Sequence, residues 1–452
     1  MLGRLHGLAA TPMHSARVLE IGCGEAYNLM ALAAAYPSAQ LHGFDLAETA
    51  IAIGKTRSEA AGIANILLWT GDIITELERI APGSYDYVIA HGVYAWVPEA
   101  VRDAVMALAA HALAPHGIAY VSYNALPGGY FRMVIRDLLL HELDGITDIA
   151  ERMATARHVL EELAKSDPRR GVTIDALRSM AESLLEKNEV VLFHDELGEI
   201  YAPQSLTDVA ATAARAGLRY LTDTDYAKIY EAFLQDGDEG GADPGETDRI
   251  LLRRAQSRNY RNTAFFHCSL FVRDDAPVKR ALDLAGFDAL LVSTTLRYDA
   301  EKDEFTDGDE RTVKFSDDAM TAAFHRIVAA QPGRIPLSEI IELDDWRDAF
   351  LKMLAASLID LHSGPAPFVA TVGDRPETSR FARFAIGEGS AKLPRLDHAD
   401  VKVERDDLRA LLVAANGERT IAEIARAVDG VFPADEVEAA LNAAAAIGLM
   451  RR

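Results

Sequence analysis

The chain has 452 residues, which exceeds the size of one hydrophobic core and indicates two or three domains. With 49% hydrophobic and 25% charged residues, it has the composition of a soluble globular protein. The formal net charge of −23 disfavours nucleic acid and anionic lipid as partners. The negative charge favours a basic protein or peptide substrate. A role of the charge in solubility alone is an equally open explanation.

Two absences narrow the class of protein further. No stretch of 18 uncharged apolar residues indicates a membrane-spanning helix, and residues 1–15 lack the hydrophobic block of a signal peptide. The two cysteines, Cys23 and Cys268, provide neither a disulfide framework nor a metal-binding spacing. The sequence therefore predicts a cytoplasmic protein with no metal site and no membrane insertion.

Residues 17–45 carry the most informative pattern. In order, they predict a buried strand, a glycine turn, an amphipathic helix and a second strand, at residues 17–21, 22–24, 25–36 and 41–44. Gly22 and Gly24 allow a ligand to approach the backbone, and Asp45 follows the second strand. This order of elements is the nucleotide-binding half of a doubly wound sheet, in which such an acid accepts ribose hydroxyls.

The glycine turn departs from a dinucleotide-binding fingerprint at two positions. A third glycine is missing, because Ala26 follows Gly22 and Gly24, and an acid, Glu20, precedes them. Glu20 would repel a pyrophosphate, so both departures favour a ligand with adenosine and ribose but no phosphate. A Rossmann-type core that binds NAD, or that binds no cofactor, stays open as the alternative.

The alternation of strand and helix continues to about residue 124. Strands are expected at 65–69, 85–90 and 117–123, and helices at 47–61 and 98–113. Such alternation predicts a parallel sheet whose ligands bind at the carboxyl ends of the strands. Polar and aromatic residues gather at these ends, at positions 20–24, 45, 71–72, 91–96 and 123–124.

Glu20, Gly22, Gly24 and Asp45, at these spacings, resemble motif I of the class I methyltransferases, which bind S-adenosylmethionine (SAM). The resemblance implies a seven-stranded Rossmann-like sheet. It also implies that the acid and the glycine turn face the amino-acid end of SAM, and that Asp45 holds the ribose.

Later segments are similar to the elements that close such a sheet. They comprise a helix at 205–217 and strands at 218–221 and 263–273, the last strand antiparallel. Two insertions interrupt the fold, a mostly helical one at 129–203 and one at 225–262 that contains a glycine-rich loop. Insertions beside the carboxyl ends are where this fold builds substrate contacts or subunit contacts.

The second half of the chain contains an internal repeat. Its two copies pair residues 329–340 with 414–424 and residues 348–360 with 438–450. Each copy has the helical pattern of a winged helix, and strands are expected before them at 288–298 and 311–315. Asp435, Glu436 and Glu438 would face phosphates in a DNA complex, so packing or protein recognition is favoured over DNA binding.

Longer stretches resemble a narrower bacterial family, the class I methyltransferases with a methyltransferase regulatory domain. They are HGVYAWVP (91–98), VSYNALPGGYFR (121–132), LFHDEL (192–197) and NYRNTAFFHCSL (259–270). This family includes protein-lysine methyltransferases that act on bacterial outer-membrane proteins. The resemblance therefore implies SAM as the cofactor, S-adenosylhomocysteine as its product and a protein as the acceptor.

The resemblance also assigns residues at the carboxyl ends of the strands to cofactor binding. They are Glu20, Gly22, Cys23, Gly24, Asn28, Asp45, Leu46, Gly71, Asp72, Ile73, His91, Gly92 and Val93. In the family, the acid in the position of Asp72 binds the adenine amino group. Capping of the next short helix is an equally good interpretation of Asp72.

The candidates for catalysis lie at the same edge. They are Tyr94, Trp96, Tyr123, Asn124 and His91. Methyl transfer from a sulfonium needs a deprotonated nucleophile held in line, and desolvation among aromatic rings favours the neutral lysine amine. Asn124 or a tyrosine hydroxyl would accept from that amine, and His91 would act as a base for an oxygen or thiol acceptor. Ordinary packing of the rings and a structural hydrogen bond of His91 stay open.

The sequence thus predicts an α/β methyltransferase with an α+β region that contains winged-helix-like repeats. Five segments are expected: a SAM-binding core (1–128), a helical insertion for substrate or homodimer contacts (129–204), the completion of the sheet (205–275), a middle domain (276–375) and a C-terminal domain (376–452). The expected function is methylation of a protein or peptide, with lysine nitrogen as the preferred acceptor. A small-molecule or natural-product methyltransferase and a non-catalytic SAM-sensing module stay open.

Overall fold

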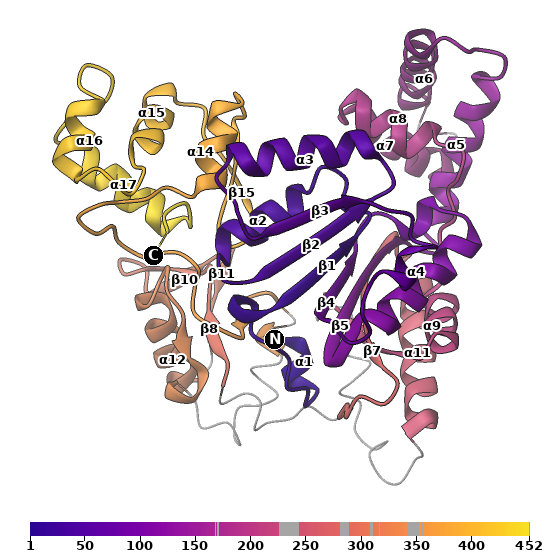
Figure 1. The fold of residues 1–452 in the computed structure, drawn as a ribbon, viewed down its shortest axis with the longest axis horizontal. Helices are drawn as coiled ribbons and strands as arrows, with labels where there is room; N and C mark the ends of the chain where they lie inside the picture. The colour runs from indigo at the N-terminus through magenta and orange to yellow at the C-terminus, as the bar shows by residue number, and fades with distance from the viewer. Residues whose placement is uncertain are drawn as a thin grey trace.

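A computed structural model describes residues 1–167, 169, 171–225, 244–280, 289–307, 311–315, 317–340, 352–354 and 356–451. Its central feature is a seven-stranded sheet of order β3-β2-β1-β4-β5-β7-β6 (Figure 1). The strands are, in chain order, β1 (Arg17–Ile21), β2 (Gln40–Asp45), β3 (Ile66–Thr70), β4 (Tyr85–Ala90), β5 (Leu113–Asn124), β6 (Leu218–Asp223) and β7 (Phe266–Arg273).

The strand order creates the place where a ligand can bind. β1 to β5 pair in parallel, and β7 runs antiparallel between β5 and β6. The chain proceeds outward from β1 to β3 and then returns to place β4 on the other side of β1, so a crevice opens between the ends of β1 and β4. The predicted Rossmann-like methyltransferase sheet, with its antiparallel last strand, is confirmed.

Helices cover both faces of this sheet. One face is covered by α1 (Leu2–Leu5), α2 (Tyr27–Ala35) and α3 (Glu48–Ala60), and the other by α4 (Glu99–Ala112), α9 (Leu206–Arg215) and α11 (Pro244–Arg261). Because side chains alternate along a strand, Val18 packs toward α2 whereas its neighbour Leu19 packs toward α4. The sheet is therefore buried on both sides, and the ends of its strands are left for ligands.

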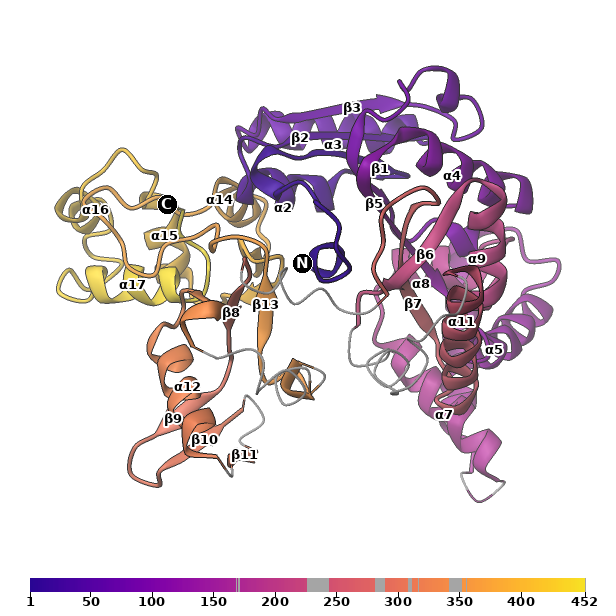
Figure 2. The same ribbon diagram turned by 90° about the horizontal axis from the view of Figure 1, so that it is seen from below.

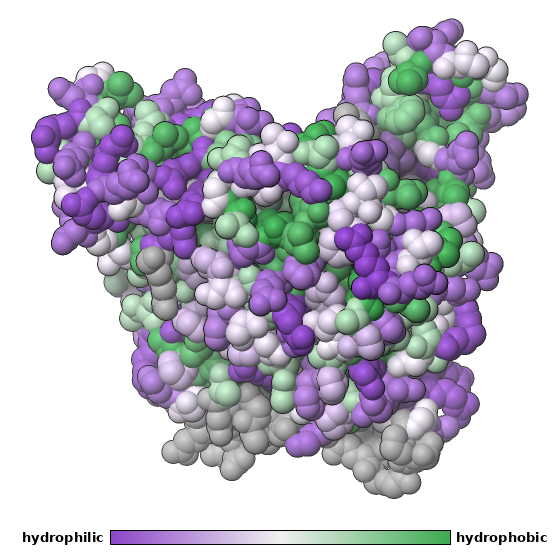
Figure 3. Space-filling view, viewed as in Figure 1, coloured by the Kyte–Doolittle hydropathy of each residue, from purple (hydrophilic) through white to green (hydrophobic). Residues whose placement is uncertain are grey.

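Between β5 and β6 the chain forms four further helices, α5 (Gly129–Glu142), α6 (Ile149–Ala164), α7 (Val172–Leu185) and α8 (Glu189–Leu197). Their apolar side chains form a buried cluster of their own. Exposed apolar residues remain on this part, including Tyr130, Val134 and Phe193, and Figure 3 shows the corresponding hydrophobic surface at its upper right. The predicted role of this segment in substrate or subunit contacts stays a prediction.

The described residues of the C-terminal half form three small sheets and five helices. The strands are β8 (Leu291–Ser293), β12 (Ile335–Pro336) and β13 (Asp360–His362) in one sheet, β9 (Arg297–Asp299), β10 (Glu304–Thr306) and β11 (Thr312–Val313) in the next, and β14 (Lys392–Pro394) and β15 (Asp400–Lys402) in a hairpin. The helices are α12 (Asp318–Ala329), α14 (Arg380–Gly387), α15 (Asp406–Ala414), α16 (Ile421–Ala427) and α17 (Val437–Ala446). Short 3-10 turns are η1 (Met13–Ser15), η2 (Glu76–Glu78), η3 (Tyr94–Trp96) and η6 (Leu337–Glu339).

One expected strand is wrong. Residues 288–298 contain two strands, β8 and β9, that belong to different sheets. The chain turns between them at Thr294, whose hydroxyl accepts from the backbone N–H of Leu296 and donates to the carbonyl of Leu358. A side chain that hydrogen-bonds its own backbone ends the strand, whatever the hydrophobicity of the run.

Several other expectations fall on residues without a description. The glycine-rich loop lies largely within residues 226–243, which are outside the described residues, and the described part of that insertion is α11. Much of the first copy of the repeat lies within residues 341–351, which are also outside them. The winged-helix assignment and the division into five domains stay predictions.

The C-terminal region is anchored on the first helix of the sheet. Tyr27 of α2 makes an edge contact with Phe381 of α14, with ring centroids 4.9 Å apart. Arg380 donates a hydrogen bond of 3.0 Å to the carbonyl of Gly62, and Leu396 belongs to the buried cluster under α2. Figures 1 and 2 agree that this region, coloured orange to yellow, lies at the α2 side of the sheet, away from α5–α11. Within the described ranges, no helix has the length and hydrophobicity that crossing a membrane requires.

A buried ion pair ties the helical insertion together. Glu196 of α8 is fully buried, and both of its oxygens accept from Arg132 of α5, at 2.6 and 3.1 Å. Arg132→Met should lower the free energy of unfolding by about 3 kcal/mol, because it removes both of these hydrogen bonds from a buried carboxylate. Urea denaturation measures this change.

Arg178→Met is the matched control. Arg178 of α7 also pairs with two carboxylates, those of Asp175 and Glu182, but both partners are about half exposed. Its loss should destabilise the protein much less than the loss of Arg132, because exposed ion pairs contribute little to stability. Equal destabilisation by the two substitutions would contradict a role for burial at Glu196.

Candidate active site

The turn between β1 and α2 has a left-handed backbone at three positions. Gly22, Gly24 and Ala26 have φ angles of 67°, 53° and 61°. Ala26 therefore keeps the conformation that a glycine favours, at a cost of about 1 kcal/mol, and α2 begins after it at Tyr27. A Cβ atom on Gly24 would meet no atom within 4 Å. The backbone of the turn thus faces open space, against which a ligand can lie.

Asp45 holds this turn in place. Its Oδ2 accepts from the backbone N–H of Gly24 at 2.9 Å, and its Oδ1 accepts from that of Ala47 at 2.8 Å. The carboxylate at the end of β2 therefore joins the glycine turn to the start of α3. Each oxygen retains a lone pair, with which it can accept a ribose hydroxyl.

Glu20, near the end of β1, is a buried acid with an unused oxygen. The residue is 4% exposed, its Oε1 accepts from Asn28 at 2.9 Å, and its Oε2 has no partner among the described residues. Burial raises the pKa of Glu20 to about 7. An unpaired buried carboxylate is costly, and a cationic ligand group placed against Oε2 would remove that cost. The ammonium of SAM fits this requirement.

Glu20 and the glycine turn line a cavity of about 450 Å³. Its inner wall comprises Glu20, Asn28 and residues 22–25 of the glycine turn, together with His91. Its outer wall comes from residues 394–400, between β14 and β15. Cys23 also lines the cavity, and burial raises the pKa of its thiol, which therefore stays neutral. The cavity coincides with the residues that the sequence assigns to the amino-acid end of the cofactor.

The residues assigned to adenosine lie along the edge of the sheet beyond this cavity. Leu46 is 72% exposed, and the backbone carbonyl of Asp45 accepts from Gly71 at 3.0 Å. Asp72 is exposed, and its Oδ1 accepts from the N–H two residues further on, at 3.0 Å. This is a local turn and not the expected helix cap, because the N-cap of η2 is Thr75 and has no side-chain hydrogen bond. The contact of Asp72 with adenine, like that of the half-buried Ile73, stays a prediction.

Residues 91–93 follow β4 and touch the glycine turn. A Cβ atom on Gly22 would come within 2.4 Å of a methyl group of Val93. The Oγ of Ser122 accepts from Gly92 and lies 2.9 Å from Nδ1 of His91. The hydroxyl of Tyr120 lies 3.3 Å from the same nitrogen, so Nδ1 of His91 is held by two side-chain hydroxyls. Burial lowers the pKa of His91 and favours its neutral form.

Tyr94 and Tyr123 lie in the core and not at the open edge. Each is 1% exposed, and their rings pack 6.1 Å apart on the face covered by α4 and α9. The hydroxyl of Tyr123 is hydrogen-bonded to Ser269 at 3.1 Å, and burial raises the pKa of Tyr94 to about 12. The structure places both rings in the packing role that the sequence left open, because the alternation along β5 turns Tyr123 away from the cavity.

Trp96, in η3, contacts the helical insertion. Its ring lies 5.2 Å from that of Tyr201, and the guanidinium of Arg132 lies 5.1 Å from its centroid. Such cation–π contacts stabilise partly desolvated arginines. Trp96 therefore helps to fix the insertion beside the sheet and does not line the cavity.

Two aromatic residues that the sequence analysis did not single out reach the edge. The rings of Tyr120 and Phe266 flank His91, at 5.8 and 6.5 Å, and Phe266 is 40% exposed. Asn124 pairs with Phe266 across β5 and β7 and is 8% exposed. The alternation along β5 already placed Tyr120 and Asn124 on one side. The sequence did not show how β7, which begins far along the chain, pairs with β5.

Gly24→Ala should fold and lose affinity for SAM. The open space admits the methyl group, which would then occupy the surface that the cofactor approaches. We expect the Kd for SAM, measured by calorimetry, to rise at least about tenfold. Gly145→Ala is the control, since Gly145 also has a positive φ and open space but lies between α5 and α6. Equal losses of affinity in both variants would contradict the assignment.

The affinity for SAM should follow the ionisation of Glu20. Because its pKa is raised to about 7, the Kd should fall as the pH rises toward neutrality, by up to about tenfold per pH unit below that pKa. Glu20→Gln should bind SAM more weakly and flatten this dependence.

The same raised pKa predicts an opposite effect on stability. Protonation of Glu20 favours the folded state, so the ligand-free wild-type protein loses stability as the pH rises from about 4.5, the ordinary pKa of a glutamate, to about 7. The ligand-free Glu20→Gln variant should not show this loss and should be the more stable protein at alkaline pH. Glu25→Gln, at an exposed cavity residue that pairs with Arg57, should change neither curve. Parallel pH curves for wild type and Glu20→Gln would exclude Glu20 as the titrating group.

Comparisons with known proteins agree with this geometry. Residues 18–117 match the family described as "Methyltransferase domain". The chain is 29% identical to protein RP789 of Rickettsia prowazekii over 288 residues, which are 62% of this chain and 50% of that protein, so it spans half of the length of RP789. It is 32% identical to RP028 of the same organism over 200 residues, which are 44% of this chain and 79% of that protein.

The whole fold is similar to a solved structure, PKMT2 from Rickettsia typhi. The TM-score is 0.82 at 20% identity, and the match covers 99% of this chain and 96% of that one. The same protein solved in complex with AdoHcy, the product that SAM leaves after methyl transfer, matches equally well at 21% identity. With its methyltransferase domain, its seven-stranded sheet and a glycine-turn cavity that fits SAM, the chain belongs to the class I SAM-dependent methyltransferases.

Proposed function

We propose that this protein transfers the methyl group of SAM to the side-chain nitrogen of lysine in a protein or peptide. The observation that carries this proposal is the aromatic edge beside the cofactor cavity. His91 lines that cavity, and the rings of Tyr120 and Phe266 lie against the ring of His91. An edge of this kind holds the apolar stem of a long side chain and leaves its terminal nitrogen at the cavity.

The apolar surface extends beyond the edge toward the helical insertion. Phe265 is 46% exposed and lies 6.3 Å from the ring of Phe131 in α5, and Tyr130 beside it is 55% exposed. A surface of this extent favours an acceptor that is larger than a metabolite. The net charge of −23 favours one with basic residues.

Similarity to other proteins supports the same class of acceptor. The sequence resembles a family that includes protein-lysine methyltransferases. The likeness to PKMT2 extends over 99% of the chain and therefore includes the parts outside the methyltransferase sheet. Those parts border the edge where an acceptor would approach.

When SAM is bound, its sulfonium supplies an electrophilic methyl group, and the task of the protein is to present a neutral amine in line with it. Contact with the rings of Tyr120 and Phe266 would remove water from a lysine amine placed among them and thereby lower its pKa. Asn124, which ends β5, would accept a hydrogen bond from that amine through its side-chain oxygen.

His91 has a positioning role in this scheme. Its Nδ1 is hydrogen-bonded to the hydroxyl of Ser122 at 2.9 Å and lies 3.3 Å from that of Tyr120, so this nitrogen is engaged within the protein. Its ring lines the cofactor cavity and contacts the rings of Tyr120 and Phe266, so it joins the aromatic edge to the cavity. The amine loses its proton to solvent before it enters the edge.

Labelled SAM identifies the acceptor. The full-length protein is incubated with methyl-deuterated SAM and fractionated bacterial extract, including outer-membrane protein, and the digest is read by mass spectrometry. We expect labelled methyl groups on lysine residues of peptides, and no label with Gly24→Ala. Label confined to low-mass metabolites, or to residues other than lysine, would contradict the proposal.

Phe266→Ala tests the aromatic edge separately from the cofactor. It should raise the KM for a labelled peptide by about tenfold, because an exposed aromatic contact is lost, and leave the Kd for SAM unchanged. Tyr260→Ala is the control, since Tyr260 is an exposed aromatic residue of α11. A change in SAM affinity, or an equal change in KM for the control, would count against this edge as the acceptor site.

A further inference from the structure

The outer wall of the cofactor cavity belongs to the C-terminal region. The turn between β14 and β15 lines it with residues 394–395 and 398–400. This turn is held by the protein itself. The N–H of Arg395 donates to the carbonyl of Ala399 at 2.8 Å, and the N–H of Leu396 donates to that of Gly448 at 2.8 Å. The contacts of Phe381 with Tyr27 fix the region on α2 beneath it.

The two walls carry different charges. Of the described residues that line the cavity, those of the methyltransferase sheet include two carboxylates, Glu20 and Glu25, and neither a lysine nor an arginine. The opposite wall provides Arg395 and His398, beside Asp400. The amino-acid end of SAM carries a carboxylate as well as an ammonium. Glu20 matches the ammonium, and the carboxylate requires a positive partner.

Arg395 has donors to spare for such a partner. Its Nη2 pairs with Asp397, its Nε is buried and has no hydrogen-bond partner among the described residues, and its side chain is 28% exposed. A guanidinium presents several donors in one plane and can bind two carboxylates at once. Arg395 can therefore keep its contact with Asp397 and accept a second anion.

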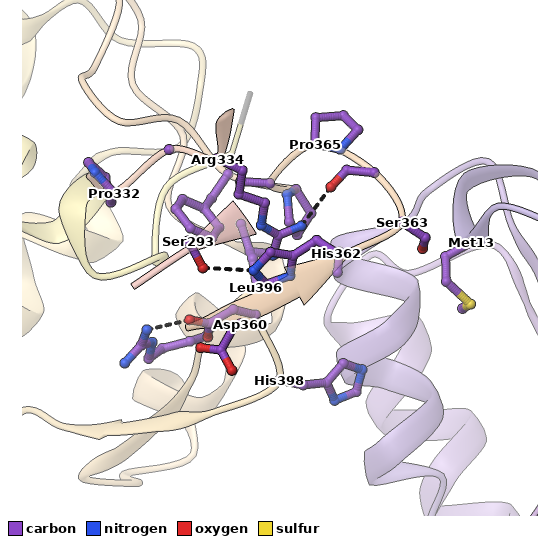
Figure 4. A pocket seen from close by; sticks show the side chains of 18 of the residues that line it. Met13, Ser293, Pro332, Arg334, Asp360, His362, Ser363, Pro365, Leu396 and His398 are labelled. Carbon is purple, nitrogen blue, oxygen red and sulfur yellow. Dashed lines mark hydrogen bonds and ion pairs between the residues drawn. The ribbon is translucent and has the colours of Figure 1, made fainter. Parts of the chain in front are cut away.

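A second, larger cavity lies on the other side of the same turn. Its volume is about 1140 Å³, and it shares Arg395 and His398 with the cofactor cavity. Figure 4 shows Arg334 and His362 on one side of this cavity and His398 on the side of the lilac N-terminal ribbon. The turn is thus a partition with space on both sides, and a ligand in the cofactor cavity can approach Arg395 directly.

We propose that Arg395 binds the carboxylate of SAM, so that the C-terminal region completes the cofactor site. The methyltransferase sheet then binds adenosine and the ammonium, and the C-terminal turn binds the remaining charged group. This inference depends on cofactor binding and is independent of the acceptor proposed above, because its test uses no acceptor. If the mass-spectrometric assay found no methylated lysine, the inference about Arg395 would be unaffected.

Calorimetry with two ligands tests this role. SAM and decarboxylated SAM share the adenosine, the sulfonium and an ammonium, and only SAM has the carboxylate. We expect the wild-type protein to bind SAM about tenfold more tightly than the decarboxylated ligand, as one charge-assisted contact provides. Arg395→Gln should weaken SAM to the affinity of the decarboxylated ligand and leave the latter unchanged. Arg395→Lys should restore part of the difference.

Arg405→Gln is the matched control. Arg405 pairs with Asp407 across the same spacing in the same region, but it does not line the cofactor cavity. It should bind both ligands as the wild type does. If Arg395→Gln kept wild-type affinity for SAM, or weakened both ligands equally, the proposal would be overturned. If thermal unfolding showed that Arg395→Gln does not fold, the affinity ratio of the two ligands in Arg395→Lys would decide: a wild-type ratio refutes the planar contact, and a reduced ratio supports it.

Discussion

The hydrogen bond from Gly24 to Asp45 is the contact on which the site depends. It joins the turn after β1 to the end of β2 at 2.9 Å, and so sets the open backbone face of the turn beside a carboxylate. Gly22, Gly24 and Ala26 all have positive φ angles in this turn, and Ala26 adopts one although it has a side chain. The crevice at the switch in strand order then provides the space for the ligand.

The local part of this arrangement was predictable from the sequence. Strand, glycine turn, helix and acid follow one another within residues 17–45, so their mutual placement depends on short connections and on the fixed handedness of such units. β4 begins and ends at the residues expected from its apolar run, Tyr85–Ala90. The antiparallel last strand was also expected, but from resemblance and not from periodicity.

The rest depended on contacts between distant residues. Tyr94 and Tyr123 are aromatic residues near strand ends, and only the three-dimensional packing of α4 and α9 shows that both are buried. Phe266 reaches His91 because β7 inserts beside β5, a pairing that spans the whole helical insertion. The hydrogen bond between the Thr294 hydroxyl and the backbone N–H of Leu296 likewise divides an apolar run into two strands.

The position of the C-terminal half is the feature of the structure that the sequence predicted least. Its repeats indicated helices and turns, and nothing in them indicated that the turn at 394–400 lies over the glycine turn. Phe381 and Leu396 explain this position, because they bury apolar surface against α2 at a distance in sequence that no local pattern reports. The cofactor cavity is therefore built by two parts of the chain and not by the sheet alone.

The central claim is that a cationic methyl donor binds against the glycine turn between β1 and α2. Calorimetric titration of the full-length protein with SAM, and in a second cell with NAD, tests it most directly. The account predicts one site that binds SAM and no measurable heat with NAD. Tight binding of NAD without binding of SAM would contradict it.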